Sequence, residues 1–264
     1  MRSVVKLGGT VAAPGPALDT LLSEVRSLLP ETQLVIVHGG GATVTRFSQR
    51  LGMTARFHHG VRITTPEEME VVDMVLAGRV NTELVRSATR AGLHAVGLTG
   101  ADCSLLVGEV IQNSQIDASG KFKLDSRTAR VKQVNLAAIT VLWNAGIVPI
   151  VATVGMGGDG HGVNINADEA ARAIAAALDA DSLLYLSDVE GVQDDDRTVI
   201  PSIETESVER LIHRETVVGG MAAKIRACRD AVRAGIRSVT IGSYTKTGDL
   251  GALLNGTRGT TIHD

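Results

Sequence analysis

The stretch Val35-Ile36-Val37-His38-Gly39-Gly40-Gly41-Ala42 joins an apolar run to three consecutive glycines. The β-branched run predicts a buried strand, and residues 42–51, which follow it, have the periodicity of a helix. A strand that passes through glycines into a helix presents free N–H groups at the positive end of the helix dipole. The stretch therefore predicts a strand–turn–helix unit with an anion site at the turn, although a simple glycine turn without a ligand has the same pattern.

Short apolar runs and helical stretches alternate along the rest of the chain. We expect strands at 4–7, 34–38, 95–98, 148–154, 182–186 and 238–241, and helices at 16–29, 42–51, 66–90, 134–145, 167–178, 206–214 and 221–234. This alternation is typical of a mostly parallel sheet covered on both faces, so the fold class is α/β, a three-layer αβα sandwich. A chain of 264 residues is near the size at which cores divide, and we expect two lobes with a boundary near residues 155–180.

Two segments depart from the alternation. Residues 104–132 contain two extended pieces separated by a turn signal at 117–120, which predicts an antiparallel insertion, either a lid or an extension of the sheet. Residues 155–162 hold five glycines, and we expect a flexible loop there.

Composition excludes several classes of protein. The net charge of −3 and only six aromatic residues argue against a nucleic-acid binder, which needs a basic surface or stacking platforms. The two cysteines, Cys103 and Cys228, predict neither a disulfide framework nor a zinc site. We find no apolar run long enough to span a bilayer and no export signal, so we expect a cytoplasmic protein.

Two lysines occupy positions where a positive charge is unfavourable unless an anion is bound. Lys6 lies within the apolar run 4–7, which ends at Leu7 and is followed by Gly8 and Gly9. Lys224 lies in the first turn of the predicted helix 221–234, at the positive end of its dipole. Taken alone, Lys6 is also compatible with an edge-strand lysine before a turn.

Polar residues at two other helix entries suggest a carboxylate site. Arg62 lies two positions after Gly60 and shortly before the predicted helix 66–90, a position suited to bidentate hydrogen bonding with a carboxylate. Asn164 and Asn166 alternate along an extended entry to the helix 167–178, which puts Asn166 at the N-cap and Asn164 on a site. Capping and dipole effects alone also explain Asp168 at the start of this helix. The adjacent histidines at 58 and 59 fit a surface or supporting role better than metal binding.

The strand 182–186 ends in Ser187-Asp188-Val189-Glu190-Gly191, and ligands bind at the carboxyl ends of parallel strands. None of the motifs contains a recognisable nucleophile with its base. Lysines, an arginine and glycine-rich helix entries instead favour chemistry that needs positioning and charge neutralisation, and phosphoryl transfer is such chemistry.

Six motifs in order resemble the amino acid kinase superfamily, and within it the N-acetylglutamate kinases. They are KLGG at 6–9, HGGG at 38–41, GVRIT at 60–64, VNINADEAA at 163–171, LSDVEGV at 186–192 and GGMAAK at 219–224. The resemblance covers essentially the whole chain. It implies an open, mainly parallel eight-stranded sheet between helices. It also implies an N-terminal lobe, residues 1–165, for the amino acid and dimerisation, and a C-terminal lobe, residues 166–264, for ATP.

The resemblance also implies roles for individual residues. Lys6 and Lys224 would stabilise the transferring phosphoryl group, with Asp168 holding both lysines in place. Four residues would bind the amino acid: Gly40, Gly41, Arg62 and Asn164. Seven would bind the nucleotide: Gly9, Ser187, Asp188, Val189, Gly191, Gly220 and Met221.

The implied reaction transfers the γ-phosphoryl group of ATP to the γ-carboxylate of N-acetyl-L-glutamate. Mg²⁺ would be held mainly by the ATP phosphates, without a protein metal site, and the enzyme would be a homodimer that binds neither nucleic acid nor membrane. Because the first strand starts at Ser3, without the N-terminal helix of arginine-inhibited relatives, we expect insensitivity to arginine.

Three alternatives stay open. Ala42-Thr43 and the histidines at 58 and 59 depart from the family pattern near the amino-acid pocket, which leaves the acyl group of the glutamate undecided. A carrier-protein-linked aminoadipate kinase of lysine biosynthesis shares the chemistry, but the net charge gives no sign of a basic patch for an acidic carrier. A non-catalytic amino-acid or nucleotide sensor of the same fold is the third.

Overall fold

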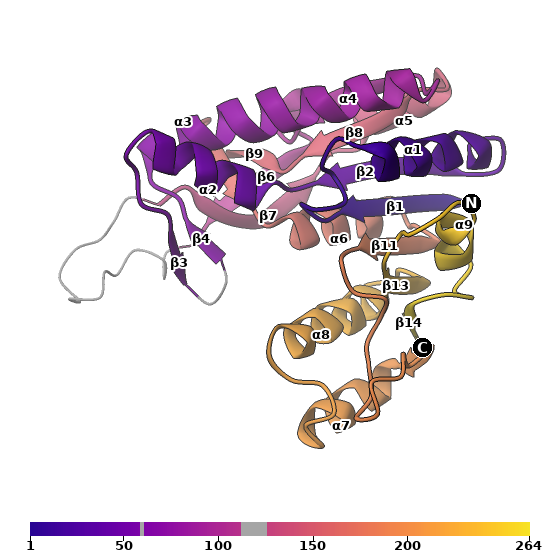
Figure 1. Ribbon diagram of the computed structural model, residues 1–264. Helices are drawn as coiled ribbons and strands as arrows, with labels where there is room; N and C mark the ends of the chain where they lie inside the picture. Colours follow the sequence, from indigo (N-terminus) through magenta and orange to yellow (C-terminus); the bar gives the residue numbers. More distant parts are fainter. Residues whose placement is uncertain (59–60, 112–125) are drawn as a thin grey trace.

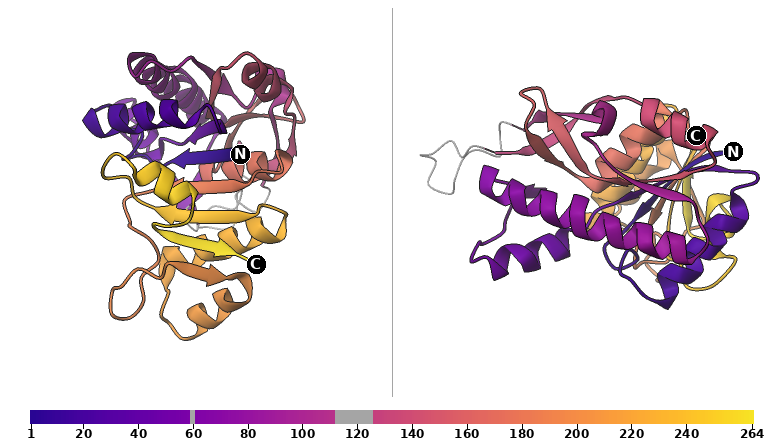
Figure 2. Two further views of the ribbon diagram at one scale, coloured as in Figure 1. Left: turned by 90° about the vertical axis from the view of Figure 1, so that its right-hand side faces the viewer. Right: turned by 90° about the horizontal axis from the view of Figure 1, so that it is seen from above.

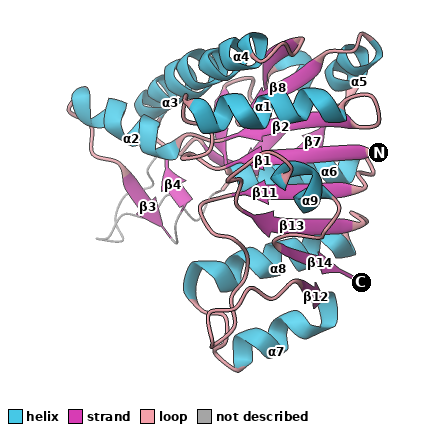
Figure 3. Cartoon of the chain, turned by 45° about the vertical axis from the view of Figure 1, so that its right-hand side comes forward, coloured by secondary structure: helices cyan, strands magenta, loops and turns pink. Residues whose placement is uncertain are grey.

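The computed structural model describes residues 1–58, 61–111 and 126–264. Its centre is an open eight-stranded sheet with the order β12 (Ser202–Glu204), β14 (Thr260–His263), β13 (Ser238–Gly242), β11 (Ser182–Leu186), β1 (Arg2–Leu7), β2 (Gln33–His38), β8 (Val148–Ala152) and β5 (Ala95–Thr99) (Figure 3). β14 is antiparallel to β13 and parallel to β12, so two strands run against the other six. The predicted α/β sandwich with a mainly parallel sheet is confirmed.

Helices cover both faces of the sheet (Figures 1 and 2). One face packs against α1 (Pro16–Leu28), α4 (Asn81–Arg90) and α9 (Asp249–Leu254). The other packs against α5 (Ala137–Asn144), α6 (Ala167–Ala177), α7 (Val208–His213) and α8 (Gly219–Arg233). Side chains alternate along a strand, so Val5 and Leu7 of β1 join the first core, and Val4 joins the second. Lys6 therefore points to the side of the sheet that carries α6.

A long helical rod lies alongside the central sheet (Figure 2). It consists of α3 (Pro66–Val72), the π-helical segment η1 (Asp73–Val80) and α4, which together confirm the predicted helix over 66–90. A capping box starts it, because Thr65 and Glu68 exchange side-chain and backbone hydrogen bonds. The neighbouring helix α2 (Gly41–Arg50) and the hairpin of β3 (Arg56–His58) and β4 (Val61–Ile63) complete this region.

The predicted insertion belongs to a small closed barrel. β6 (Leu106–Val110) follows the 3₁₀ turn η2 (Asp102–Ser104) and matches the first predicted extended piece, but its antiparallel partner is β7 (Thr128–Val134), which was not predicted as a strand. The barrel closes through β9 (Val154–Gly157) and β10 (Gly162–Ile165), so the expectation that the insertion extends the central sheet is wrong. The predicted turn at 117–120 and the second extended piece lie outside the described residues.

The loop expected over 155–162 is shorter in the structure, because residues 155–157 belong to β9 and residue 162 to β10, which leaves a turn over 158–161. A Cβ atom at Gly155 would lie 2.6 Å from Ile165 Cδ1, so this glycine permits close packing inside the barrel. Two further boundaries differ. The strand predicted at 148–154 divides at Thr153, where the chain leaves the central sheet for the barrel, and α5 begins at Ala137 because residues 128–134 form β7.

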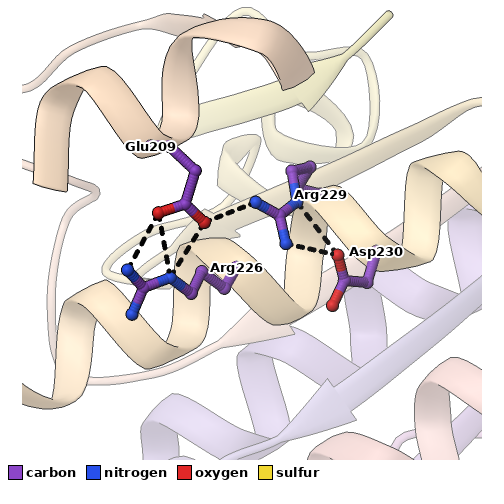
Figure 4. A network of polar contacts seen from close by, with 4 residues as sticks. All are labelled: Glu209, Arg226, Arg229 and Asp230. Atoms are coloured by element: carbon purple, nitrogen blue, oxygen red, sulfur yellow. Dashed lines mark hydrogen bonds and ion pairs between the residues drawn. The ribbon is translucent and has the colours of Figure 1, made fainter.

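A polar network on the surface ties α7 to α8 (Figure 4). Glu209 accepts hydrogen bonds from Arg226 Nη2 at 2.9 Å and from Arg229 Nη1 at 2.5 Å, and Arg229 also binds Asp230 at 2.7 Å. Hydrogen bonds from the two guanidinium groups lower the pKa of Glu209 to about 2. A short 3₁₀ turn, η4 (Thr205–Ser207), precedes α7.

The division into lobes at residues 165 and 166 stays a prediction, because a single sheet runs through both parts of the chain. Among the described residues, no helix combines the length and apolar character needed to cross a bilayer.

Candidate active site

Three adjoining cavities lie at the carboxyl ends of the parallel strands. The central one, about 860 Å³, is lined by Lys6, Lys224 and Asp188 among others. A second, of about 250 Å³, contains Arg62 and shares Lys6 and the glycine triplet with the first. A third, of about 420 Å³, shares Asp188 with the central cavity. In Figure 1 these strand ends lie between α2 above and α8 below.

Lys6 is held by the start of α6. Its Nζ lies 2.7 Å from Asp168 Oδ1, and the two side chains are 15% and 34% exposed. Asn166 is the N-cap, as predicted, because its Oδ1 accepts hydrogen bonds from the amides of Asp168 and Glu169 at 2.9 and 3.2 Å. The Tyr185 hydroxyl donates to the carbonyl of Asp168 at 3.1 Å. The position of Asp168 is thus fixed from both ends of its backbone, and Lys6 is directed by it.

Lys224 lines the central cavity from the other side. It lies in the second turn of α8 and not in the first, because the helix already begins at Gly219. The ion pairs within the described parts of the chain include Lys6–Asp168 but none between Asp168 and Lys224. One turn further on, burial raises the pKa of the Cys228 thiol, so this cysteine stays protonated and does not act as a nucleophile.

In the glycine triplet at 39–41 the carbonyl oxygens have hydrogen-bond partners, while two of the amides have none among the described residues. Each carbonyl oxygen accepts a hydrogen bond from a nearby donor: His38 Nδ1 to Gly39 at 2.8 Å, the Val44 amide to Gly40 at 3.0 Å, and Thr45 Oγ1 and Arg62 Nη2 to Gly41 at 2.9 and 3.2 Å. The N–H groups of Gly40 and Gly41 have no acceptor among the described residues. Free amides at the start of a helix are suited to an anion, and the anion site predicted here stays a prediction.

Arg62 is a buried cation that lines the second cavity together with Lys6. It is only 7% exposed, its guanidinium lies 4.8 Å from the centre of the Phe57 ring, and Nη2 also contacts Thr45 Oγ1. Nη1 is buried and has no hydrogen-bond partner among the residues that the structure describes, which is costly unless a ligand supplies an acceptor. Burial lowers the pKa of Arg62 from its ordinary value, while the nearby Glu68 raises it. Asn164 lines the same cavity and donates to Thr64 Oγ1 at 2.9 Å.

The predicted nucleotide residues lie mainly around the third cavity. Asp188, Val189, Gly191 and Met221 line it, Ser187 lines the central cavity, and Gly220 lies in the first turn of α8. Packing alone also requires a glycine at position 191, because a Cβ atom there would lie 2.6 Å from Val199 Cγ1.

Gly9 differs from Gly191 in its surroundings. It lines the central and second cavities, and a Cβ there would meet nothing within 4 Å. Packing therefore does not require a glycine at this position, which leaves room for a ligand to approach the backbone closely.

Sequence reasoning missed three arginines around one ring. The guanidinium groups of Arg46, Arg50 and Arg79 lie 6.0, 5.0 and 5.7 Å from the centre of the Phe47 ring. None of the three forms an ion pair or hydrogen bond with a described residue, and Arg46 and Arg79 line the central cavity. The net charge of the chain could not show this cluster, because Arg79 joins Arg46 and Arg50 of α2 only when α2 packs on η1.

Within the described ranges, no group of three or more His, Cys, Asp and Glu side chains is placed to hold a metal ion.

The family model of the amino acid kinase family matches residues 1–243. The chain belongs to this family and is a kinase. It is 40% identical over 245 residues to an acetylglutamate kinase of Methanopyrus kandleri, covering 90% of this chain and 93% of the relative. An acetylglutamate kinase of Rubrobacter xylanophilus is 37% identical over 262 residues, covering 99% and 97%. A crystal structure of smu.665 from Streptococcus mutans UA159 superposes with a TM-score of 0.81 at 27% identity, covering 99% and 98%.

Proposed function

We propose that this kinase transfers the γ-phosphoryl group of ATP to the γ-carboxylate of N-acetyl-L-glutamate, giving N-acetyl-L-glutamyl 5-phosphate, the second step of arginine biosynthesis. The observation that carries the proposal is the buried, unpaired Nη1 of Arg62, in a cavity that shares Lys6, Gly40 and Gly41 with the central one. An acceptor bound there by its α-carboxylate would present a second carboxylate to Lys6. The names of the relatives support the same acceptor.

The chemistry needs no general base. A γ-carboxylate with an ordinary pKa of about 4.3 is ionised at neutral pH and is already a nucleophile. The barrier comes from the approach of a carboxylate to a polyanionic triphosphate. Lys6, Lys224 and the free amides of Gly40 and Gly41 would face the transferring group and offset this repulsion, and Asp168 would keep Lys6 in place.

Mg²⁺ would arrive with ATP, bound to the phosphate oxygens, and would neutralise part of their charge. The lining of the central cavity fits such a complex. It has two lysines for phosphate oxygens, and the Asp188 carboxylate is shared with the cavity assigned to the nucleotide.

The test is a hydroxamate assay for acyl phosphate with Mg-ATP and a panel of N-acetylglutamate, N-succinylglutamate, glutamate, aspartate, aminoadipate and UMP. We expect turnover with an N-acylated glutamate and little with glutamate itself. ATP binding without turnover on any acceptor would replace the kinase by a non-catalytic sensor of the same fold. The homodimer and the cytoplasmic location predicted from the sequence belong to this proposal, and a native mass of one 27.6 kDa chain would contradict the first.

One observation favours a second candidate, the carrier-linked aminoadipate kinase. The cluster of Arg46, Arg50 and Arg79 forms a local basic patch beside the central cavity, which suits an acidic carrier despite the net negative charge of the chain. Turnover of a carrier-linked aminoadipate, with none of free N-acetylglutamate, would favour this candidate.

A further inference from the structure

One buried hydrogen bond decides which way a site amide points. The carbonyl of Gly39 and the N–H of Gly40 belong to the same planar trans peptide, so they point in opposite directions. His38 Nδ1 lies 2.8 Å from that carbonyl oxygen. A donor at Nδ1 holds the oxygen on the histidine side and turns the Gly40 N–H the other way, and Gly40 lines both the central and the acceptor cavity.

The hydrogen-bond network fixes the tautomer of His38. Asn81 Nδ2 lies 2.9 Å from the Ile150 carbonyl and 3.0 Å from His38 Nε2. The carbonyls of Ile150 and, at 3.5 Å, of Leu98 can only accept, so Asn81 Nδ2 is the donor in this group, and His38 Nε2 lies closer to it than the Leu98 oxygen does. Nε2 is therefore the acceptor, and the proton of the neutral ring is on Nδ1. His38 has no exposed surface, and burial lowers its pKa to about 4, which keeps the ring neutral at physiological pH.

The surroundings are shaped to hold Asn81 in this position. Asn81 follows directly on the π-helical segment η1, and π-helical turns often occur at functional sites. A Cβ at Gly97 of β5 would lie 1.9 Å from Asn81 Oδ1, so a bare backbone at that position makes room for the amide. Leu76 and Val80 of η1 pack closely against Gly40. A Cβ atom on Gly40 would lie 2.7 Å from Leu76 Cδ2 and 3.3 Å from Val80 Cγ2.

We propose that His38 and Asn81 are positioning residues that lock the Gly39–Gly40 peptide, so that the Gly40 N–H faces the transferring phosphoryl group. The pair does not touch the reacting atoms. The inference rests on the proposed function for its kinetic consequence, but the geometry of the lock exists without substrate.

Two substitutions of His38 separate the lock from simple packing. In His38→Asn the side-chain amide can occupy the place of Nδ1 and keep the donor to Gly39. In His38→Gln the amide reaches the place of Nε2, keeps the contact with Asn81 and loses that donor. Asn is the smaller side chain and leaves the larger cavity, so His38→Asn should be the less stable of the two. We expect it nevertheless to be the more active one.

The measurements are kcat, the KM values for ATP and acceptor, and Tm. We expect His38→Gln to lower kcat about 10- to 100-fold with smaller changes in either KM, because a misdirected oxyanion donor costs part of what a deleted one costs. His38→Asn should retain kcat within a few fold. If kcat follows Tm instead, so that His38→Asn is the slower variant, the proposal is overturned.

A second readout does not depend on activity. In ¹H–¹⁵N spectra of the ligand-free protein, His38 should carry its proton on Nδ1, and the Gly40 amide resonance should move in His38→Gln but not in His38→Asn. A proton on Nε2, or equal shifts in both variants, would reject the lock. An inactive wild-type protein with these spectra would reject the proposed function while leaving the lock supported.

Discussion

Lys6 is a charged residue between the core residues Val5 and Leu7 of β1, and its Nζ lies 2.7 Å from the carboxylate of Asp168. We expect Lys6→Ala and Lys224→Ala each to lower kcat about 10²- to 10³-fold and to raise KM less, because both charges would act mainly on the transition state. Asp168→Asn should also be slow, since it releases Lys6.

Steady-state kinetics with ATP and the acceptor test this. Lys132→Ala, at an exposed position on β7, is the matched control and should behave like the wild type. An unchanged kcat in Lys6→Ala would remove the lysine from the mechanism.

Arg62 should act on binding of the acceptor and not on the nucleotide. Arg62→Gln removes the charge and the unpaired Nη1, and we expect the acceptor KM to rise about 10- to 100-fold, as for a lost charge-assisted hydrogen bond. Arg62→Lys keeps the charge without the planar fork and should lie between the two. The exposed Arg56→Gln on β3 is the control. A rise in the ATP KM of equal size would assign Arg62 to a different ligand.

At the scale of elements, the start of α6 links stability to catalysis. Asn166→Ala removes the N-cap, and we expect a loss of about 1 kcal/mol in the free energy of unfolding together with a lower kcat, because the cap also fixes Asp168. Asn166→Asp keeps a capping oxygen and should preserve stability. Denaturant unfolding and kinetics on the same samples test both. A destabilised Asn166→Ala with wild-type kcat would show that Asp168 is held by Tyr185 alone.

The tie between α7 and α8 should depend on pH. The pKa of Glu209 is lowered from 4.5 to about 2, so the folded state favours the carboxylate. Its contribution is complete above about pH 5 and is lost as the pH falls toward 2. Glu209→Gln should therefore lower Tm at pH 7, and the difference from wild type should shrink as the pH falls from 5 to 3. A Tm difference that does not change over this range would contradict an ionic role.

The sequence predicted those helices, strands and caps that are specified by a local pattern of residues. The six strands of β-branched residues and the Asn166 cap are local patterns, and each was predicted. The barrel strands β9 and β10 were not predicted, because glycines such as Gly155 indicate a loop in the sequence. The reason for a glycine at this position is its close packing against Ile165, which only the structure shows. The Asn81 contact with His38 could not be found either, since 43 positions separate two residues that meet only in the fold.

For the molecule as a whole, the net charge is negative, but positive charge is concentrated at the central cavity. The chain has a formal charge of −3, but the mouth of the central cavity carries Arg46 and Arg79 without ion-pair partners among the described residues. Unpaired cations at a cavity attract anionic substrates over a distance that salt shortens. We expect Arg46→Gln and Arg79→Gln to lower kcat/KM severalfold at low ionic strength, with kcat nearly unchanged.

The check is the salt dependence of kcat/KM, which should be weaker in these variants than in the wild type. Arg237→Gln is the control, because Arg237 is paired with Asp181 and lines none of the three cavities. Parallel salt profiles in all variants would show that the arginines do not guide substrate.

The central place of β1 has a consequence for biosynthesis. β1 pairs with β2 on one side and with β11 on the other. In the pairing with β11, Val4 is in register with Leu183. At about 5–20 residues per second, a ribosome needs roughly 7–30 s to make the chain between β2 and β11. During that time one edge of an apolar strand lacks its neighbour, which is the state in which strands aggregate. The edge of β1 can therefore be covered only after β11 has been synthesised. A stalled or truncated product that lacks β11 should bind chaperones.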